Sequence, residues 1–210
     1  MAFCQIPKKP SVSIRAICGQ KTSTIRLALF HRAPHADSLS MTPESKDALR
    51  LKKTLTYANG YRELGMFKAA LEELSQLPEN LSDRLEGLQM RLAILIDAKD
   101  WASATCTAKT LVLREPNEPT HLVNLAFVTR RSQSLGEAKT ILADAAQRFP
   151  KIGIIHYNLG CYACQEQDLE SAKIILAKAF SLDPSFLNTA KTDEDLIVLQ
   201  FWLKTLKTVK

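Results

Sequence analysis

The sequence predicts an all-α protein in which one helical hairpin is repeated four times. Its 210 residues are 46% hydrophobic and include only seven glycines, a composition that favours helices around an apolar core. One constant spacing, the number of residues from Ala70 to Ala104, separates many of the apolar residues from one another. When the units are written one below the other, residues with this spacing form columns. The most regular column contains Ala70, Ala104, Ala138 and Ala172. Two further columns contain Pro116, Pro150 and Pro184, and Phe67, Trp101, Leu135 and Leu169. Several columns in one phase indicate a structural unit used four times.

The N-terminal segment differs in composition from the rest of the chain. Residues 1–40 contain six cations and one acid, so they carry a charge of +5, and residues 41–210 carry only +1. The basic pI therefore belongs to this segment and does not predict nucleic-acid binding by the folded part. The longest apolar run near the N-terminus, at residues 25–30, is too short to span a membrane.

We interpret residues 1–41 as a disordered basic N-terminal tail. The alternatives are a mis-assigned start, with Met41 the natural first residue, an organellar transit peptide, or an arm that binds nucleic acid or membrane. The expected location is cytoplasmic, or inside an organelle if the basic segment directs import.

The helical domain is predicted to cover residues 42–210. Thr42-Pro43-Glu44 combines an N-cap residue, a proline at the first helical position and a first-turn acid, which is typical of a helix start. The four units are then 51–84, 85–118, 119–152 and 153–186. Pro78 falls early in the first unit, so the second helix of that unit is expected to be short.

Each unit contains two apolar stripes with helical spacing, separated by a polar break. Two antiparallel helices need small residues where they approach most closely, and Gly160 and Ala172 supply them in the last unit. In the second unit Leu92 replaces the glycine, and we expect Ala108 to make room for it. One hairpin cannot bury both of its faces, so the units are expected to stack.

The end of such a stack needs a polar cap, which we predict as one helix over residues 192–208. Thr192 is the expected N-cap residue, and Asp193–Asp195 place acids in the first turn. An apolar stripe follows, with lysines in the last turn.

The period, the alanine and proline columns, the large apolar column and the Leu159-Gly160 pair resemble the tetratricopeptide repeat (TPR) family. The resemblance covers nearly all of residues 43–210 and is strongest in the last unit, whereas the second unit lacks the Leu-Gly pair. It implies a right-handed α-solenoid of four TPR hairpins plus a C-terminal capping helix. It also implies a non-catalytic protein-protein interaction module, such as an adaptor, scaffold or chaperone-like protein, that binds a partner peptide or helix in its concave groove.

The resemblance assigns the concave face to particular positions of the first helix of each unit. These positions predict an apolar and aromatic floor beside a basic edge, which suits a peptide or helix with apolar anchors and some acid. The predicted groove residues are Asn59, Arg62, Gln89, Val123, Phe127, Arg130, Arg131, Tyr157 and Cys161. The remaining residues at the same positions are Lys52, Leu55, Glu63, Glu86, Ala93, Ile96, Asp97, Thr120, Ile154, Cys164 and Gln165. No cofactor is expected. An oligomeric scaffold, with the groove filled by its own tail or by a neighbouring copy, is an alternative.

Cys161 and Cys164 form a Cys-x-x-Cys pair, so a thiol- or metal-dependent protein is the alternative function. Redox pairs work at helix N-termini, but the repeat register places both residues inside a helix. A structural zinc site needs about four ligands, and no second pair accompanies these two. We therefore expect small, partly exposed packing thiols. Five irregularly spaced cysteines do not indicate a secreted disulfide framework, and no motif for phosphate binding or nucleophilic catalysis is present in the sequence.

Overall fold

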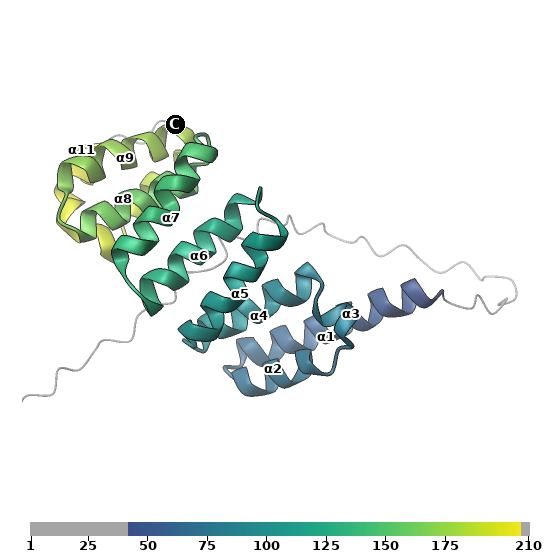
Figure 1. Ribbon diagram of the computed structural model, residues 1–210. Coiled ribbons are helices and arrows are strands. Elements are labelled where there is room, and N and C mark those ends of the chain that lie inside the picture. The colour runs from purple at the N-terminus through teal and green to yellow at the C-terminus, as the bar shows by residue number, and fades with distance from the viewer. Residues whose placement is uncertain (1–41, 207–210) are drawn as a thin grey trace, which may run out of the picture. The chain divides into compact units, whose positions relative to one another are not determined.

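The computed structural model describes residues 42–206, which contain helices and no β-strand (Figure 1). The first helices of the four hairpins are α1 (Pro43–Glu63), α4 (Leu85–Asp97), α6 (Pro119–Ser132) and α8 (Gly153–Gln165). The second helices are α2 (Phe67–Ser75), α5 (Trp101–Arg114), α7 (Leu135–Arg148) and α9 (Leu169–Leu182). The predicted N-terminal tail and residues 207–210 lie outside the described residues.

The helix boundaries have the same spacing as the columns of the sequence. The second helices begin at the four residues of the large apolar column, Phe67, Trp101, Leu135 and Leu169. The alanine column lies one turn further along these helices, and each of its side chains is 0% exposed. Small residues are required at these points because the two helices of a hairpin pack against each other there.

A second column explains why the second helices begin where they do. The residue before each of α5, α7 and α9 is an N-cap whose side chain accepts a hydrogen bond from a backbone N–H in the first turn. The three N-cap bonds are Ser103 N–H to Asp100 (3.2 Å), Glu137 N–H to Ser134 (3.1 Å) and Ser171 N–H to Asp168 (3.2 Å). The first hairpin has Met66 at this place and lacks the side-chain bond.

The first hairpin departs from the others as the sequence predicts. Helix α1 begins at Pro43 with Thr42 as its N-cap residue, and the Thr42 hydroxyl accepts a hydrogen bond from the Ser45 N–H. Helix α2 has nine residues, whereas α5, α7 and α9 each have 14. Pro78 lies just beyond it and starts the short helix α3 (Glu79–Ser82).

The C-terminal cap differs from the single helix predicted over residues 192–208. The chain instead forms α10 (Ser185–Ala190), the 3₁₀ helix η2 (Glu194–Leu199) and α11 (Gln200–Thr205). Leu196, Leu199 and Leu203 are 0–2% exposed and belong to the same apolar cluster as hairpins three and four. The cap thus completes the largest apolar cluster of the described chain.

No helix within residues 42–206 has both the length and the apolar composition that crossing a bilayer requires.

Candidate functional site

The predicted groove residues of the first unit connect neighbouring hairpins. Asn59 Oδ1 accepts hydrogen bonds from Arg62 Nε (3.1 Å) and Nη2 (3.0 Å). Arg62 Nη1 in turn donates to Asp97 Oδ2 at 2.7 Å, which joins α1 to α4. The guanidinium is therefore held between α1 and α4, and it helps to pack the first hairpin against the second.

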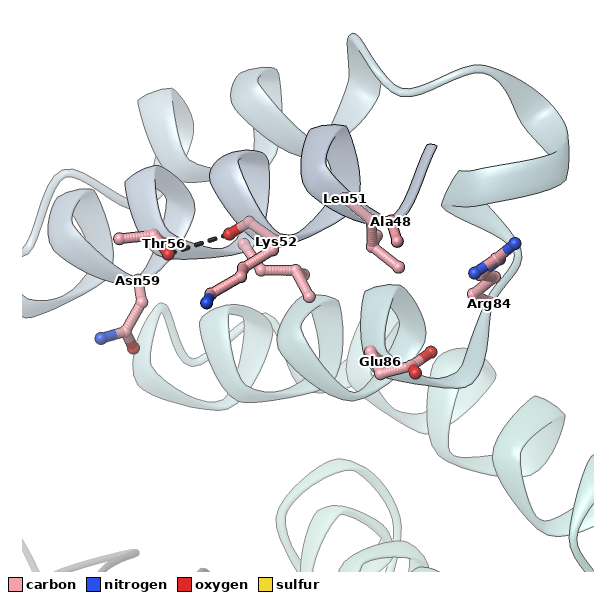
Figure 2. Close-up of a pocket in the computed structure, with 8 residues that line it drawn as sticks. Ala48, Leu51, Lys52, Thr56, Asn59, Arg84 and Glu86 are labelled. Atoms are coloured by element: carbon pink, nitrogen blue, oxygen red, sulfur yellow. Dashed lines mark hydrogen bonds between the residues drawn. The ribbon is translucent and has the colours of Figure 1, made fainter. Parts of the chain in front are cut away.

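A groove of about 520 Å³ lies on α1 and at the start of α4, beside this bridge (Figure 2). Its lining residues are Ala48, Leu51, Lys52, Leu55, Thr56, Asn59, Arg84 and Glu86. Three of them, Lys52, Leu55 and Asn59, occupy positions of the first unit that the TPR resemblance assigns to the concave face, here called the inner face. Glu86 occupies such a position in the second unit. The groove is therefore lined in part by positions that the TPR resemblance predicts to face a partner.

The groove has an apolar floor and a charged rim. Leu51 is 5% exposed and Leu55 is half-buried, so both offer apolar surface to the cavity. Lys52, Arg84 and Glu86 are exposed, and their side chains have no hydrogen-bond or ion-pair partner among residues 42–206. Figure 2 shows Lys52 on α1, with Arg84 and Glu86 at the start of α4. Gln89, one turn along α4, is also exposed.

Trp101, which the sequence does not predict as a groove residue, packs beside the predicted aromatic floor of the third unit. Phe127 on α6 is half-buried and packs edge-to-face against Trp101 of α5, with ring centroids 6.3 Å apart. The guanidinium of Arg131 lies 5.6 Å from the Phe127 ring and 5.9 Å from the Trp101 ring. Val123 is buried, at 7% exposure. The sequence assigns Trp101 only to hairpin packing, because its column marks the start of a second helix.

The three remaining predicted residues contact the C-terminal cap of the same chain. Tyr157 Oη donates to Asp193 Oδ2 at 2.7 Å, and Cys161 Sγ lies 3.9 Å from the same oxygen. Arg130 donates to both carboxylate oxygens of Asp195, at 2.5 and 3.0 Å. The sequence predicts that these residues meet a partner, and the structure instead pairs them with the acids at the start of η2.

Burial and these acids set the electrostatics of this part of the inner face. The hydrogen bond to Asp195 raises the pKa of Arg130, so its charge is permanent. Burial, with the nearby Cys161 and Asp193, raises the pKa of Tyr157, and burial raises the pKa of Tyr162 to about 12. Both phenols are therefore neutral at physiological pH, and Tyr157 donates its proton to the bond with Asp193.

The Cys-x-x-Cys thiols are more deeply buried than predicted. Cys161 is 3% and Cys164 is 0% exposed, whereas the sequence predicts partly exposed thiols. Their surroundings in hairpin four explain the difference, because both side chains belong to its apolar cluster. Burial raises the pKa of both thiols, which opposes formation of the nucleophilic thiolate. Within residues 42–206, no three His, Cys, Asp or Glu side chains are grouped so as to hold a metal ion.

Thiol titration tests this description. In a Cys4→Ser, Cys18→Ser variant, the exposed Cys106 should react quickly with a disulfide reagent at about pH 8. Cys161 and Cys164 should react only when the chain is unfolded, because both are buried and protonated. Three fast thiols in the folded protein would contradict the burial of the pair and favour a thiol-dependent function.

No protein-family model matches this sequence, and a search of curated proteins returns no match. Among solved structures the chain is similar to MamA 41-end from Desulfovibrio magneticus RS-1, a TPR protein, at 16% identity and a TM-score of 0.55. That match covers 64% of this chain and 76% of the other. MamA MSR-1 C2 is similar at 17% identity and a TM-score of 0.53, with 66% of this chain and 80% of the other covered. The comparison, over the 64% of the chain that it covers, and the helix register of residues 42–206 agree on the fold of a tetratricopeptide-repeat array.

Proposed function

We propose that this protein is a non-catalytic scaffold that binds a segment of another protein on the inner face of its first two hairpins. The observation that carries the proposal is the groove of about 520 Å³ lined by α1 and the start of α4. It coincides with the inner-face positions of a TPR array. An apolar floor beside charges of both signs is the arrangement that peptide-binding grooves use for anchoring and orientation.

The bound segment is expected to place an apolar side chain over Leu51 and Leu55. The rim adds two cations, Lys52 and Arg84, and one acid, Glu86, so it selects a segment that carries charge next to its apolar anchor. Burial of the anchor supplies most of the affinity, while the exposed charges mainly affect the association rate. The N-terminal half of the inner face suits this role better than the C-terminal half, where the predicted contacts are made by the chain itself.

A variant that fills the groove tests the proposal. Thr56 is an exposed lining residue whose hydroxyl donates to the Lys52 carbonyl oxygen four residues earlier. Thr56→Trp should leave helicity and thermal unfolding unchanged. Proteins that the full chain captures from native lysate should bind the variant with an affinity at least about tenfold lower. The reason is that the indole occupies the space of the ligand.

Thr140 offers a matched control. It is also an exposed helical threonine, and its hydroxyl donates to the Gly136 carbonyl oxygen four residues earlier, but it lies on α7, away from the groove. Thr140→Trp should bind like the wild type. Equal affinity of the Thr56→Trp and wild-type proteins for every captured partner would remove the groove from consideration.

A further inference from the structure

The acidic start of the cap makes polar contacts with two hairpins at once. Asp193 accepts from Tyr157 Oη at 2.7 Å, and Asp195 binds the Arg130 guanidinium through both carboxylate oxygens. Gln165 Nε2 donates to the Asp195 carbonyl oxygen at 2.9 Å. The segment therefore bridges α6 and α8 through charge-assisted bonds, which are among the strongest hydrogen bonds in proteins.

Every side chain that the acidic segment contacts in these bonds is an inner-face position of the TPR register. Arg130, Tyr157 and Cys161 are predicted groove residues, and Gln165 occupies another such position. The occupant also has the predicted chemistry of a ligand, because three consecutive acids are followed at once by Leu196, an apolar anchor that is 0% exposed.

We propose that residues 193–196 are an internal ligand of the third and fourth hairpins, and that an acidic partner segment of the pattern Asp-x-Asp-Leu competes with them for Arg130 and Tyr157. This inference rests on the proposed use of the inner face for protein binding, and it names the chemistry of the second segment that this face recognises. The C-terminal half of the face is then closed by the cap and opens when a segment of the same chemistry replaces it.

Two features of the cap lower the free-energy cost of opening, which has to expose the buried Leu196, Leu199 and Leu203. Its first part is a 3₁₀ helix, in which backbone hydrogen bonds have poorer geometry than in an α-helix. Ile197, Val198 and Phe201 are 70%, 53% and 85% exposed, so the docked cap leaves three large apolar side chains in water. A released cap can bury these side chains against a partner, which lowers the free energy of the open state relative to the closed one.

Competition of this kind has a quantitative consequence. A ligand that binds only the open state has an apparent dissociation constant raised by the inverse of the open fraction. Weakening the cap therefore increases the affinity for an acidic segment without adding any contact to that segment. It also increases the exposure of Cys161, which contacts Asp193.

Alkylation of the buried thiols measures opening of the cap without any partner. The protein is the full chain with Cys4→Ser, Cys18→Ser and Cys106→Ser, so that only Cys161 and Cys164 remain. Asp193 and Asp195 also raise the pKa of both thiols, so the rate compared is the rate constant of the thiolate, taken from the pH dependence of iodoacetamide labelling. Adding Asp193→Asn and Asp195→Asn should raise this rate constant at least about tenfold, because the charge-assisted bonds are lost. Asp144→Asn, an exposed acid on α7 outside these contacts, should leave the rate unchanged.

A second reporter separates cap opening from general unfolding. Ala104 is 0% exposed in the second hairpin, so an Ala104→Cys side chain in a background without the native cysteines labels only when that hairpin opens. Its rate should be the same with and without the two cap substitutions. Equal labelling of Cys161 and Cys164 with the wild-type and the substituted cap, or a parallel rise at position 104, would overturn the proposal.

A synthetic peptide of residues 190–203 then tests the ligand chemistry. In the variant with the neutralised cap, the peptide should protect Cys161 from labelling, and the same peptide with Asp193→Asn and Asp195→Asn should not. Equal protection by both peptides would show that the acids are not recognised, and the proposal would be wrong. Neither outcome depends on the groove of the first two hairpins, so failure here is distinguishable from failure of the Thr56→Trp test.

Discussion

Gly160→Leu should lower the free energy of unfolding by about 3 kcal/mol or more, because the close contact between α8 and α9 has no room for a side chain. A Cβ atom at Gly160 would lie 2.7 Å from Leu176 Cγ and 2.9 Å from Leu176 Cδ2. Leu176 is 0% exposed and belongs to the apolar cluster that joins hairpins three and four to the cap, so it has no free space to enter. The gain of about 1 kcal/mol in helix propensity only partly offsets this clash.

The second hairpin shows how the same contact accepts a leucine. Leu92 occupies the position equivalent to Gly160, and Ala108 occupies the position equivalent to Leu176. Both are buried, at 3% and 1% exposure, in one cluster. The large and small residues are thus exchanged between the two helices, as the sequence predicts from volume alone.

The exchange can be transplanted into the fourth hairpin. Leu176→Ala alone should cost about 2–5 kcal/mol, as expected for a buried leucine removed from a packed core. The double variant Gly160→Leu, Leu176→Ala should be more stable than either single variant, with a coupling free energy above about 2 kcal/mol. Urea unfolding followed by circular dichroism measures all four proteins.

Gly136 is the matched control for the glycine. It lies near the start of α7, and a Cβ atom there would meet nothing within 4 Å. Gly136→Leu should be neutral or slightly stabilising. A double variant no more stable than Gly160→Leu alone would show that the contact between these two positions does not govern the packing of the hairpin.

The repeat was predictable because close helix packing restricts residue size at regular intervals. An alanine buried at 0% exposure in each second helix has equivalent surroundings in every hairpin, so the sequence repeats its size at every unit. The connections inside the hairpins are less visible in the sequence. Gly65, Lys99 and Gln167 occupy the same position of their repeats and have φ angles of 74°, 59° and 66°. Only the first is a glycine, the residue type that marks this conformation.

The cap was mispredicted because an apolar stripe does not report a change of helix type. Leu196 and Leu199 are three residues apart, the period of a 3₁₀ helix, and Leu199 and Leu203 are four apart, which fits an α-turn. Asp193, which precedes these leucines, accepts two hydrogen bonds with different roles. Asp193 caps η2 by accepting from the Asp195 N–H at 2.9 Å and also accepts from Tyr157, a contact that helix periodicity alone does not predict.

The helices that carry the predicted groove residues were predictable, but the surroundings of these residues were not. The register places Asn59, Arg130 and Tyr157 on first helices correctly, because a position in the repeat fixes the direction of a side chain. The residues that pack against such a side chain can come from segments that are distant in the sequence. Arg130 is 65 residues from Asp195, and no spacing rule of the repeat connects the two. The pairing therefore becomes visible only in the folded chain.

The two adjacent arginines of α6 should consequently respond differently to charge reversal. Arg130→Glu places a carboxylate against Asp195, removes two hydrogen bonds and ends the contact with the Tyr162 ring at 5.1 Å. The side chains of Arg130 and Asp195 are 19% and 29% exposed, so water screens the pair only in part. We expect a loss of about 2 kcal/mol in the free energy of unfolding, between the values for exposed and buried pairs.

Arg131→Glu should change stability by no more than about 0.5–1 kcal/mol, because within residues 42–206 this exposed side chain makes cation–π contacts with Trp101 and Phe127 and no ion pair. The reversed pair Arg130→Glu, Asp195→Arg should recover part of the loss, since opposite charges face each other again. Urea unfolding of the four proteins measures these differences. Equal losses for the two single arginine variants would contradict a specific bridge to the cap, because both substitutions change the net charge of α6 by the same amount and only one breaks the contact with Asp195.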